Sequence, residues 1–219
     1  VLAVATHAAA MVGEEPTDRW PALFGACTMA AIAVANTRWW TDPDVDLVDE
    51  EIVEPLTVLH RALNDESHID EEGARAYEAK FLRLLANRLR MKRDFQRHPE
   101  IAEQKIKGPL VIIGVARSGT TKLQKVLAAS GDFNYLTFWQ NFNWASISGK
   151  PGEAIESRIA EAEEFCNWFD RRSPETKLGH QFQAMEPEEE GPLSEGCFVA
   201  PSFIGYAEMP SYMHWLADK

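Results

Sequence analysis

One segment constrains the fold of this chain more than any other. Residues 110–115 (LVIIGV) form a short, continuous apolar run rich in β-branched residues, and residues 122–129 follow with the pattern of a helix. A run of this kind predicts a strand buried on both faces of a parallel sheet. A second strand is predicted at residues 135–139, so the order strand, glycine loop, helix, strand indicates the α/β class.

The loop between the first strand and its helix carries the chemistry. Its glycines, Gly114 and Gly119, are five residues apart, the spacing of a phosphate-binding loop. Such a loop surrounds an anion with backbone N–H groups and directs a helix N-terminus at it. Arg117 is the only cation between the glycines, and Thr120 stands where nucleoside triphosphatases have a lysine. The anion is expected to contact Gly114, Arg117, Ser118, Gly119, Thr120 and Thr121.

Upstream of this loop the periodicity is helical. An apolar stripe with an acidic start and a basic end predicts one long helix that opens at Asp70 and ends before His98. Shorter helices are predicted at residues 152–170 and 210–218. We therefore predict an α/β P-loop nucleotide-binding fold with a parallel sheet flanked by helices. A mainly helical N-terminal extension (residues 1–107) precedes that domain (residues 108–219).

Composition excludes several classes of function. The 219 residues include 22 basic and 34 acidic side chains, giving a net charge of −12, whereas a nucleic-acid or anionic-membrane binder needs a basic face. The longest apolar run, residues 22–35, is too short for an ordinary membrane span. Three widely spaced cysteines, Cys27, Cys166 and Cys197, suit neither a zinc site nor a disulfide framework. We predict free thiols, no metal, and a cytoplasmic location.

Residues 110–123 resemble the 5′-phosphosulfate loop of sulfotransferases, which take a sulfuryl group from 3′-phosphoadenosine 5′-phosphosulfate (PAPS). The arginine before S-G-T-T is similar to the bacterial branch that sulfates small molecules. Segments 84–101, 180–190 and 209–216 are similar to its L-x-N-R-L…hPEI, H-x-x-x-A-x-x-P-E-E and P-x-Y-x-x-W-L patterns. The resemblance covers roughly residues 50–219. It implies a PAPS-dependent sulfotransferase with a small-molecule hydroxyl acceptor and no metal.

The sequence offers more than one interpretation of the residue that acts as the catalytic base. Many relatives have a tryptophan-glutamate pair after the second strand, but here the pair is Trp139-Gln140, and glutamine cannot act as a base. We expect Gln140 to orient the acceptor instead. His180, close to the glutamates of residues 186–190, is the candidate base, with one glutamate orienting it. A structural role for His180 is an equally good interpretation, and the glutamates also suit a helix N-terminus.

Aromatic residues cluster just after the loop helix. Core packing accounts for most of them, but Phe142 and Trp144 are candidates to line an acceptor pocket, because ligands of open α/β sheets bind beyond the carboxyl ends of the strands. Such a pocket suits an apolar or aromatic alcohol.

Relatives bind the 3′-phosphate and complete the sheet with segments beyond the last one matched here. The resemblance therefore implies a domain incomplete at its C-terminus, the N-terminal half of a longer protein or one piece of a split one. The expected partners are that missing half or further copies of the chain in a homo-oligomer. Two alternatives stay open. A P-loop nucleotide kinase or NTPase is disfavoured by Thr120 in the lysine position. A non-catalytic nucleotide-binding or interaction subunit is consistent with Gln140.

Overall fold

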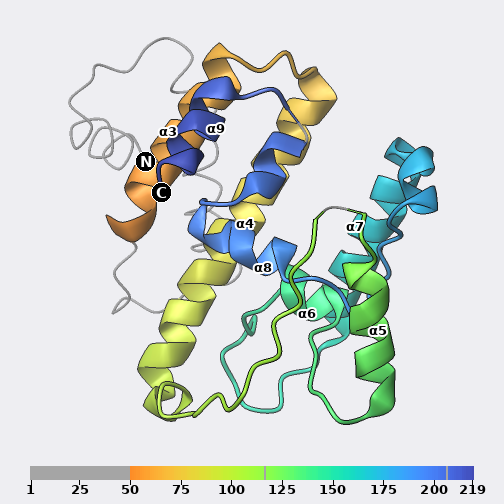
Figure 1. Ribbon diagram of the computed structural model, residues 1–219. Helices are drawn as coiled ribbons and strands as arrows, with labels where there is room; N and C mark the ends of the chain where they lie inside the picture. Colours follow the sequence, from red (N-terminus) through yellow and green to blue (C-terminus); the bar gives the residue numbers. More distant parts are fainter. Residues whose placement is uncertain (1–49, 116, 206) are drawn as a thin grey trace. The chain divides into compact units, whose positions relative to one another are not determined.

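The computed structural model describes residues 50–115, 117–205 and 207–219, and it separates into two compact units (Figure 1). The described residues of the first unit are 50–93 and 194–219 without residue 206, and the second unit is Asp94–Leu193. None of the described helices is long and apolar enough to cross a membrane. The α-helices are α3 (Glu50–Asp65), α4 (Glu71–Arg97), α5 (Thr120–Ser130), α6 (Phe138–Phe142), α7 (Glu156–Arg172), α8 (Gly191–Ser194) and α9 (Pro210–Ala217). Short 3₁₀ turns are η2 (Pro99–Ile101), η3 (Pro174–Leu178), η4 (Glu195–Cys197) and η5 (Pro201–Gly205).

Helix α4 confirms the long helix predicted from the apolar stripe. It buries Tyr77, Phe81 and Leu84 on one face. Its first turn carries two glutamates and its last turn Arg97, so both ends complement the helix dipole. The following His98-Pro99 ends it, because the residue before a proline disfavours helical backbone.

The core of the first unit forms where residues 194–219 return to α4. Phe198, Phe203 and Tyr212 have no exposed surface. The ring of Phe203 stacks on Phe198 at 6.2 Å, while Phe81 of α4 meets the Phe198 ring edge-on at 5.9 Å. The buried Tyr212 hydroxyl accepts from the Ala200 N–H at 3.1 Å, so its polar atom is satisfied.

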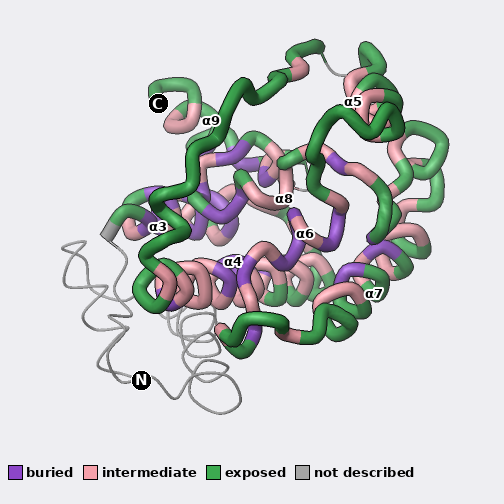
Figure 2. Tube along the Cα trace, turned by 90° about the horizontal axis from the view of Figure 1, so that it is seen from below, coloured by how far each residue is buried: buried purple, intermediate pink, exposed green. Residues whose placement is uncertain are grey.

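The second unit has a separate aromatic core between α6 and α7. Phe138 and Phe142 of α6 pack against Phe165 of α7, with ring centroids 5.8 and 4.9 Å apart. Ala162 and Cys166 fill the same core, and burial raises the pKa of the Cys166 thiol to about 12. Figure 2 shows the buried stretch along α6, in contrast to the exposed and half-exposed trace of α5.

The predicted parallel sheet is wrong. The described residues contain no sheet, and Figure 1 draws no strand arrow in them; their single β-bridge joins Thr137 to Pro187. Residues 110–115 belong to no helix or strand, and Val111 is 68% and Ile113 90% exposed. A strand buried on both faces requires hydrogen-bonded neighbours, and no described segment pairs with this one. The α/β class and its P-loop fold are therefore overturned for the part of the chain described.

The second predicted strand, at residues 135–139, is also wrong. Helix α6 begins at Phe138 because Thr137 and Gln140 form a capping box, in which the Thr137 N–H donates to the Gln140 side-chain oxygen at 2.8 Å. The capping pair directs the aromatic residues into a helix. The predicted domain boundary at residue 107 stays a prediction.

Candidate functional site

The glycine loop contains a compact turn, although the described residues before it form no sheet. The Ser118 N–H donates to the Val115 carbonyl at 3.2 Å, and Gly119, with φ of 97°, leads into α5. A Cβ on Gly114 would lie 2.5 Å from Ser118 Oγ and 2.9 Å from the Thr120 methyl carbon. A side chain at position 114 would therefore force the side chains of Ser118 and Thr120 to move.

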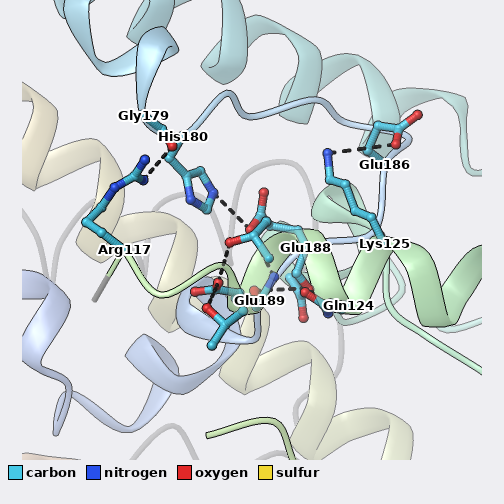
Figure 3. A network of polar contacts seen from close by, with 11 residues as sticks. Arg117, Gln124, Lys125, Gly179, His180, Glu186, Glu188 and Glu189 are labelled. Atoms are coloured by element: carbon cyan, nitrogen blue, oxygen red, sulfur yellow. Dashed lines mark hydrogen bonds and ion pairs between the residues drawn. The ribbon is translucent and has the colours of Figure 1, made fainter. Parts of the chain in front are cut away.

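Arg117 sits in the loop with an unusual backbone and a tethered side chain. Its φ is 67°, in the left-handed region that L residues rarely adopt. Its guanidinium donates to the carbonyl of Gly179 (Figure 3). A Cβ on Gly179 would lie 3.4 Å from Arg117 Nη1, so the guanidinium packs closely against that backbone. The loop is thus attached to residues 179–190, which we call the acidic segment.

The first turn of α5 presents two hydroxyls to a carboxylate. Thr121 Oγ1 donates to Glu189 Oε1 at 2.6 Å, and Thr120 Oγ1 donates to the same oxygen at 3.2 Å. The positive end of the helix dipole favours negative charge at this place. These donors therefore form an anion-binding group, and in this structure their anion is the side chain of Glu189.

His180 and Glu188 form a hydrogen-bonded pair within the acidic segment. Nε2 of His180 lies 3.0 Å from Oε1 of Glu188, whose side chain is only 3% exposed. The hydrogen bond to Glu188 raises the pKa of His180 above its ordinary value, against an opposing effect of burial. The Phe182 ring packs on the imidazole at 4.7 Å. With Nε2 committed to Glu188, Nδ1 is the nitrogen that remains to exchange a proton.

Two amide side chains support the acidic segment from α5 and α6. Gln124 Nε2 donates to the carbonyl of Glu188 at 2.9 Å, and Asn141 Nδ2 donates to the same oxygen at 3.1 Å. Lys125 Nζ lies 3.8 Å from Glu186 Oε2 (Figure 3).

We did not predict Gln124 or Asn141 from the sequence. The available signal was the polar Asn141 within the aromatic run of α6, since a buried amide there needs a partner.

The expected acceptor residues make other contacts in the structure. Gln140 uses its side-chain oxygen to cap α6, and Phe142 packs in the core of the second unit. Trp144 is half-buried, and its indole nitrogen has no hydrogen-bond partner among the residues described. In contrast, the acidic segment brings the other predicted residues together. It contains His180, which pairs with Glu188, and it accepts hydrogen bonds from Arg117, Thr120 and Thr121.

The network contains carboxylates, but their arrangement does not suit a metal. Within the described ranges no group of three or more His, Cys, Asp or Glu side chains is placed to hold a metal ion. Each hydrogen bond of the network pairs a donor with a carboxylate or carbonyl oxygen. The arrangement can bind an anion at the loop and move a proton at His180.

Two solved structures share the fold of this chain. The sulfotransferase STF1 from Mycobacterium tuberculosis H37Rv is 22% identical, with a TM-score of 0.65 over 90% of this chain and 52% of that one. The sulfotransferase STF9 from Mycobacterium avium is 19% identical, with a TM-score of 0.67 over 94% and 51%. This chain therefore spans about half the length of these sulfotransferases. At such identities the likeness establishes a common fold.

The sequence comparisons add little to the structural likeness. A family model described as the MftR C-terminal domain matches residues 2–64 and does not reach the loop. No curated protein sequence matches the chain significantly.

Proposed function

We propose that this chain binds PAPS through the loop at residues 114–121 and transfers the sulfuryl group to a hydroxyl of a small molecule. The observation that carries the proposal is the donor set of the loop, Arg117, Thr120 and Thr121, attached to the segment that contains the His180–Glu188 pair. The donors suit an anion, because two of them already hold a carboxylate. The sulfotransferase folds of the two solved neighbours support the same assignment.

PAPS, when bound, supplies the sulfuryl group and a phosphate leaving group. Transfer of this kind passes through a loose transition state that demands little covalent chemistry of the protein. Arg117, the hydroxyls of Ser118, Thr120 and Thr121, and the loop N–H groups stabilise the negative charge on the leaving oxygen. Donors fixed in this way contribute about 3–4 kcal/mol each where they have been measured. In this proposal these donors bind the charge of the leaving phosphate.

His180 takes the proton that the acceptor hydroxyl loses. Nε2–H donates to Glu188, and the lone pair of Nδ1 accepts the proton while the acceptor oxygen forms its new bond. Glu188 stabilises the imidazolium that results, because its carboxylate is buried and adjacent. The small-molecule acceptor is an apolar or aromatic alcohol in this proposal, with Trp144 as the aromatic residue left to contact it.

The test is binding of PAP, the desulfated product, by the whole chain. Ligand-dependent thermal stability is measured for the unmodified protein, for Arg117→Ala, and for Arg171→Ala, which removes an exposed arginine of α7. Arg117→Ala is expected to weaken PAP binding by about 1.5–3 kcal/mol, the contribution of a hydrogen bond to a charged group. Arg171→Ala should bind as the unmodified protein does. Equal PAP stabilisation in all three proteins would contradict a site at this loop.

Two controls separate the alternatives. Stabilisation by ATP with magnesium but not by PAP would favour a nucleotide kinase or NTPase. A non-catalytic nucleotide-binding or interaction subunit has one observation in its favour: Gln140 is committed to the cap of α6 and supplies no base. PAP binding without sulfuryl transfer to any of a panel of alcohols and phenols would support that second function.

A further inference from the structure

The donors assigned to the ligand's phosphate are already engaged by the chain itself. Thr120 and Thr121 donate to Glu189, and Arg117 donates to the carbonyl of Gly179 (Figure 3). Both acceptors belong to the acidic segment. A ligand that takes over these donors must therefore displace three hydrogen bonds to two acceptors in one stretch of the chain.

We propose that Glu189 is an internal competitor of the anionic ligand, an autoinhibitory contact that closes the loop until the ligand displaces it. This inference rests on the proposed function, because the ligand it concerns is the phosphosulfate end of PAPS. It adds a regulatory step: the hydroxyls of α5 exchange one anion, the Glu189 carboxylate, for another.

The geometry of the contact suits a competitor. One carboxylate oxygen of Glu189 accepts from both hydroxyls, at 2.6 and 3.2 Å, at the positive end of an 11-residue helix. A short hydrogen bond to a charged acceptor is stronger than a neutral one. A tetrahedral anion at this helix end needs the same hydroxyl hydrogens, so both anions cannot be held by them at once.

The acidic segment keeps Glu189 in place through its neighbour. The Glu189 N–H donates to Glu188 Oε1 at 2.9 Å, and that oxygen also pairs with His180. The carbonyl of Glu188 is held by Gln124 of α5. The competitor is thus positioned by the same pair that is assigned the proton transfer, and its release occurs next to the candidate base.

The other glutamates of the segment have different surroundings. Glu186 lies near Lys125, and Glu190 is exposed. Glu189 is the member of the segment whose side chain meets the hydroxyls of the loop helix. Glu190→Gln therefore removes an equal charge from the adjacent position and serves as the matched control.

The experiment measures two dissociation constants by calorimetry, for inorganic sulfate and for PAP. The proteins are the unmodified chain, Glu189→Gln, Glu189→Ala and Glu190→Gln. If Glu189 closes the loop in nine molecules of ten, both Glu189 variants bind both anions about tenfold more tightly, because the apparent affinity scales with the open fraction. Glu190→Gln is expected to stay within about twofold. In a Thr120→Val/Thr121→Val background the gain should disappear, since the contested hydroxyls are gone.

The outcomes are distinguishable. Equal sulfate affinity in the two Glu→Gln variants would overturn the competitor role and leave only a general effect of charge. Unchanged affinities with a lower turnover in Glu189→Gln would overturn it in favour of a catalytic carboxylate. A third outcome is that the Glu189 variants bind sulfate more tightly, while PAP binds no more tightly than sulfate in any variant. That outcome would support Glu189 as a competitor and reject PAPS as the ligand. Circular dichroism of each variant establishes that it folds.

Discussion

Two histidines, one in each compact unit, show how differently the units use polar side chains. His60 in α3 is 3% exposed, and burial lowers its pKa to about 4. His180 is paired with Glu188, and that hydrogen bond raises its pKa. The first histidine is kept neutral by its surroundings, whereas the second is kept ready to hold a proton. Only the second has the electrostatic setting of a chemical group.

The core of the first unit and helix α5 of the second unit show a further difference. The first unit closes on Phe198, Phe203 and Tyr212, which have no exposed surface. Helix α5 of the second unit buries no residue completely and contacts the acidic segment through Gln124, Lys125 and its threonine hydroxyls. Polar contacts to a helix end can be exchanged for those of a ligand, whereas a packed ring cannot. The contrast therefore separates a region that stabilises the fold from the region proposed to bind the ligand.

The largest expected effect tests the packing side of this contrast. Phe203→Ala should lower the free energy of unfolding by about 3–5 kcal/mol, because it opens a cavity in the core of the first unit. Leu123→Ala on α5, where the leucine is 48% exposed, should change it by about 0.5 kcal/mol or less. Urea denaturation of both variants measures the difference. Similar losses in the two would erase the distinction between the regions.

A smaller effect concerns His60. Its folded pKa of about 4 lies below the ordinary 6.5, so the unfolded chain takes up the proton first as the pH falls. Neutral His60 contributes fully to the free energy of unfolding above pH 6.5. As the pH falls from 6.5 to about 4, that free energy decreases by about 3 kcal/mol. His60→Gln should remove that part of the acid sensitivity. A pH-dependence of unfolding unchanged in the variant would refute the assignment.

The smallest effect has the opposite sign and concerns His180. Because the pKa of His180 is raised in the folded protein, its contribution to the free energy of unfolding is complete below pH 6.5. That contribution is lost as the pH rises from 6.5 through the folded pKa. Glu188→Gln should lower the His180 pKa, followed by NMR, and should cost about 1 kcal/mol below pH 6.5. An unshifted His180 resonance titration in this variant would show that Glu188 does not set the proton affinity.

Local sequence predicted the helices better than it predicted the loop's surroundings. The stripe of Tyr77, Phe81 and Leu84 identifies α4, because a helix face depends on spacing within one segment. Residues 110–115 have the composition of a buried strand, but burial depends on a partner that periodicity does not supply. The capping box of Thr137 and Gln140 was likewise present in the sequence and explains the helix where a strand was expected.

The site was predictable in its residue types but not in its pairings. The spacing of Gly114 and Gly119 indicates an anion-binding loop, and the resemblance nominates Arg117 and His180. Among adjacent glutamates, however, sequence cannot decide which meets the imidazole and which meets the threonines. That choice depends on the path of residues 180–190, where Glu188 turns to His180 and Glu189 turns to α5.

At position 117 the residue that would stabilise the fold most differs from the residue that the proposed ligand needs, because Arg117 has a left-handed backbone. A residue with a side chain in that conformation lowers the stability of the fold by about 1–2 kcal/mol, and glycine would avoid this cost. Selection for a sturdier fold alone would therefore favour glycine at position 117, and selection for anion binding favours the guanidinium. An improvement of this protein by stability-guided design would reach that position early, and it would remove the side chain on which the proposed chemistry depends.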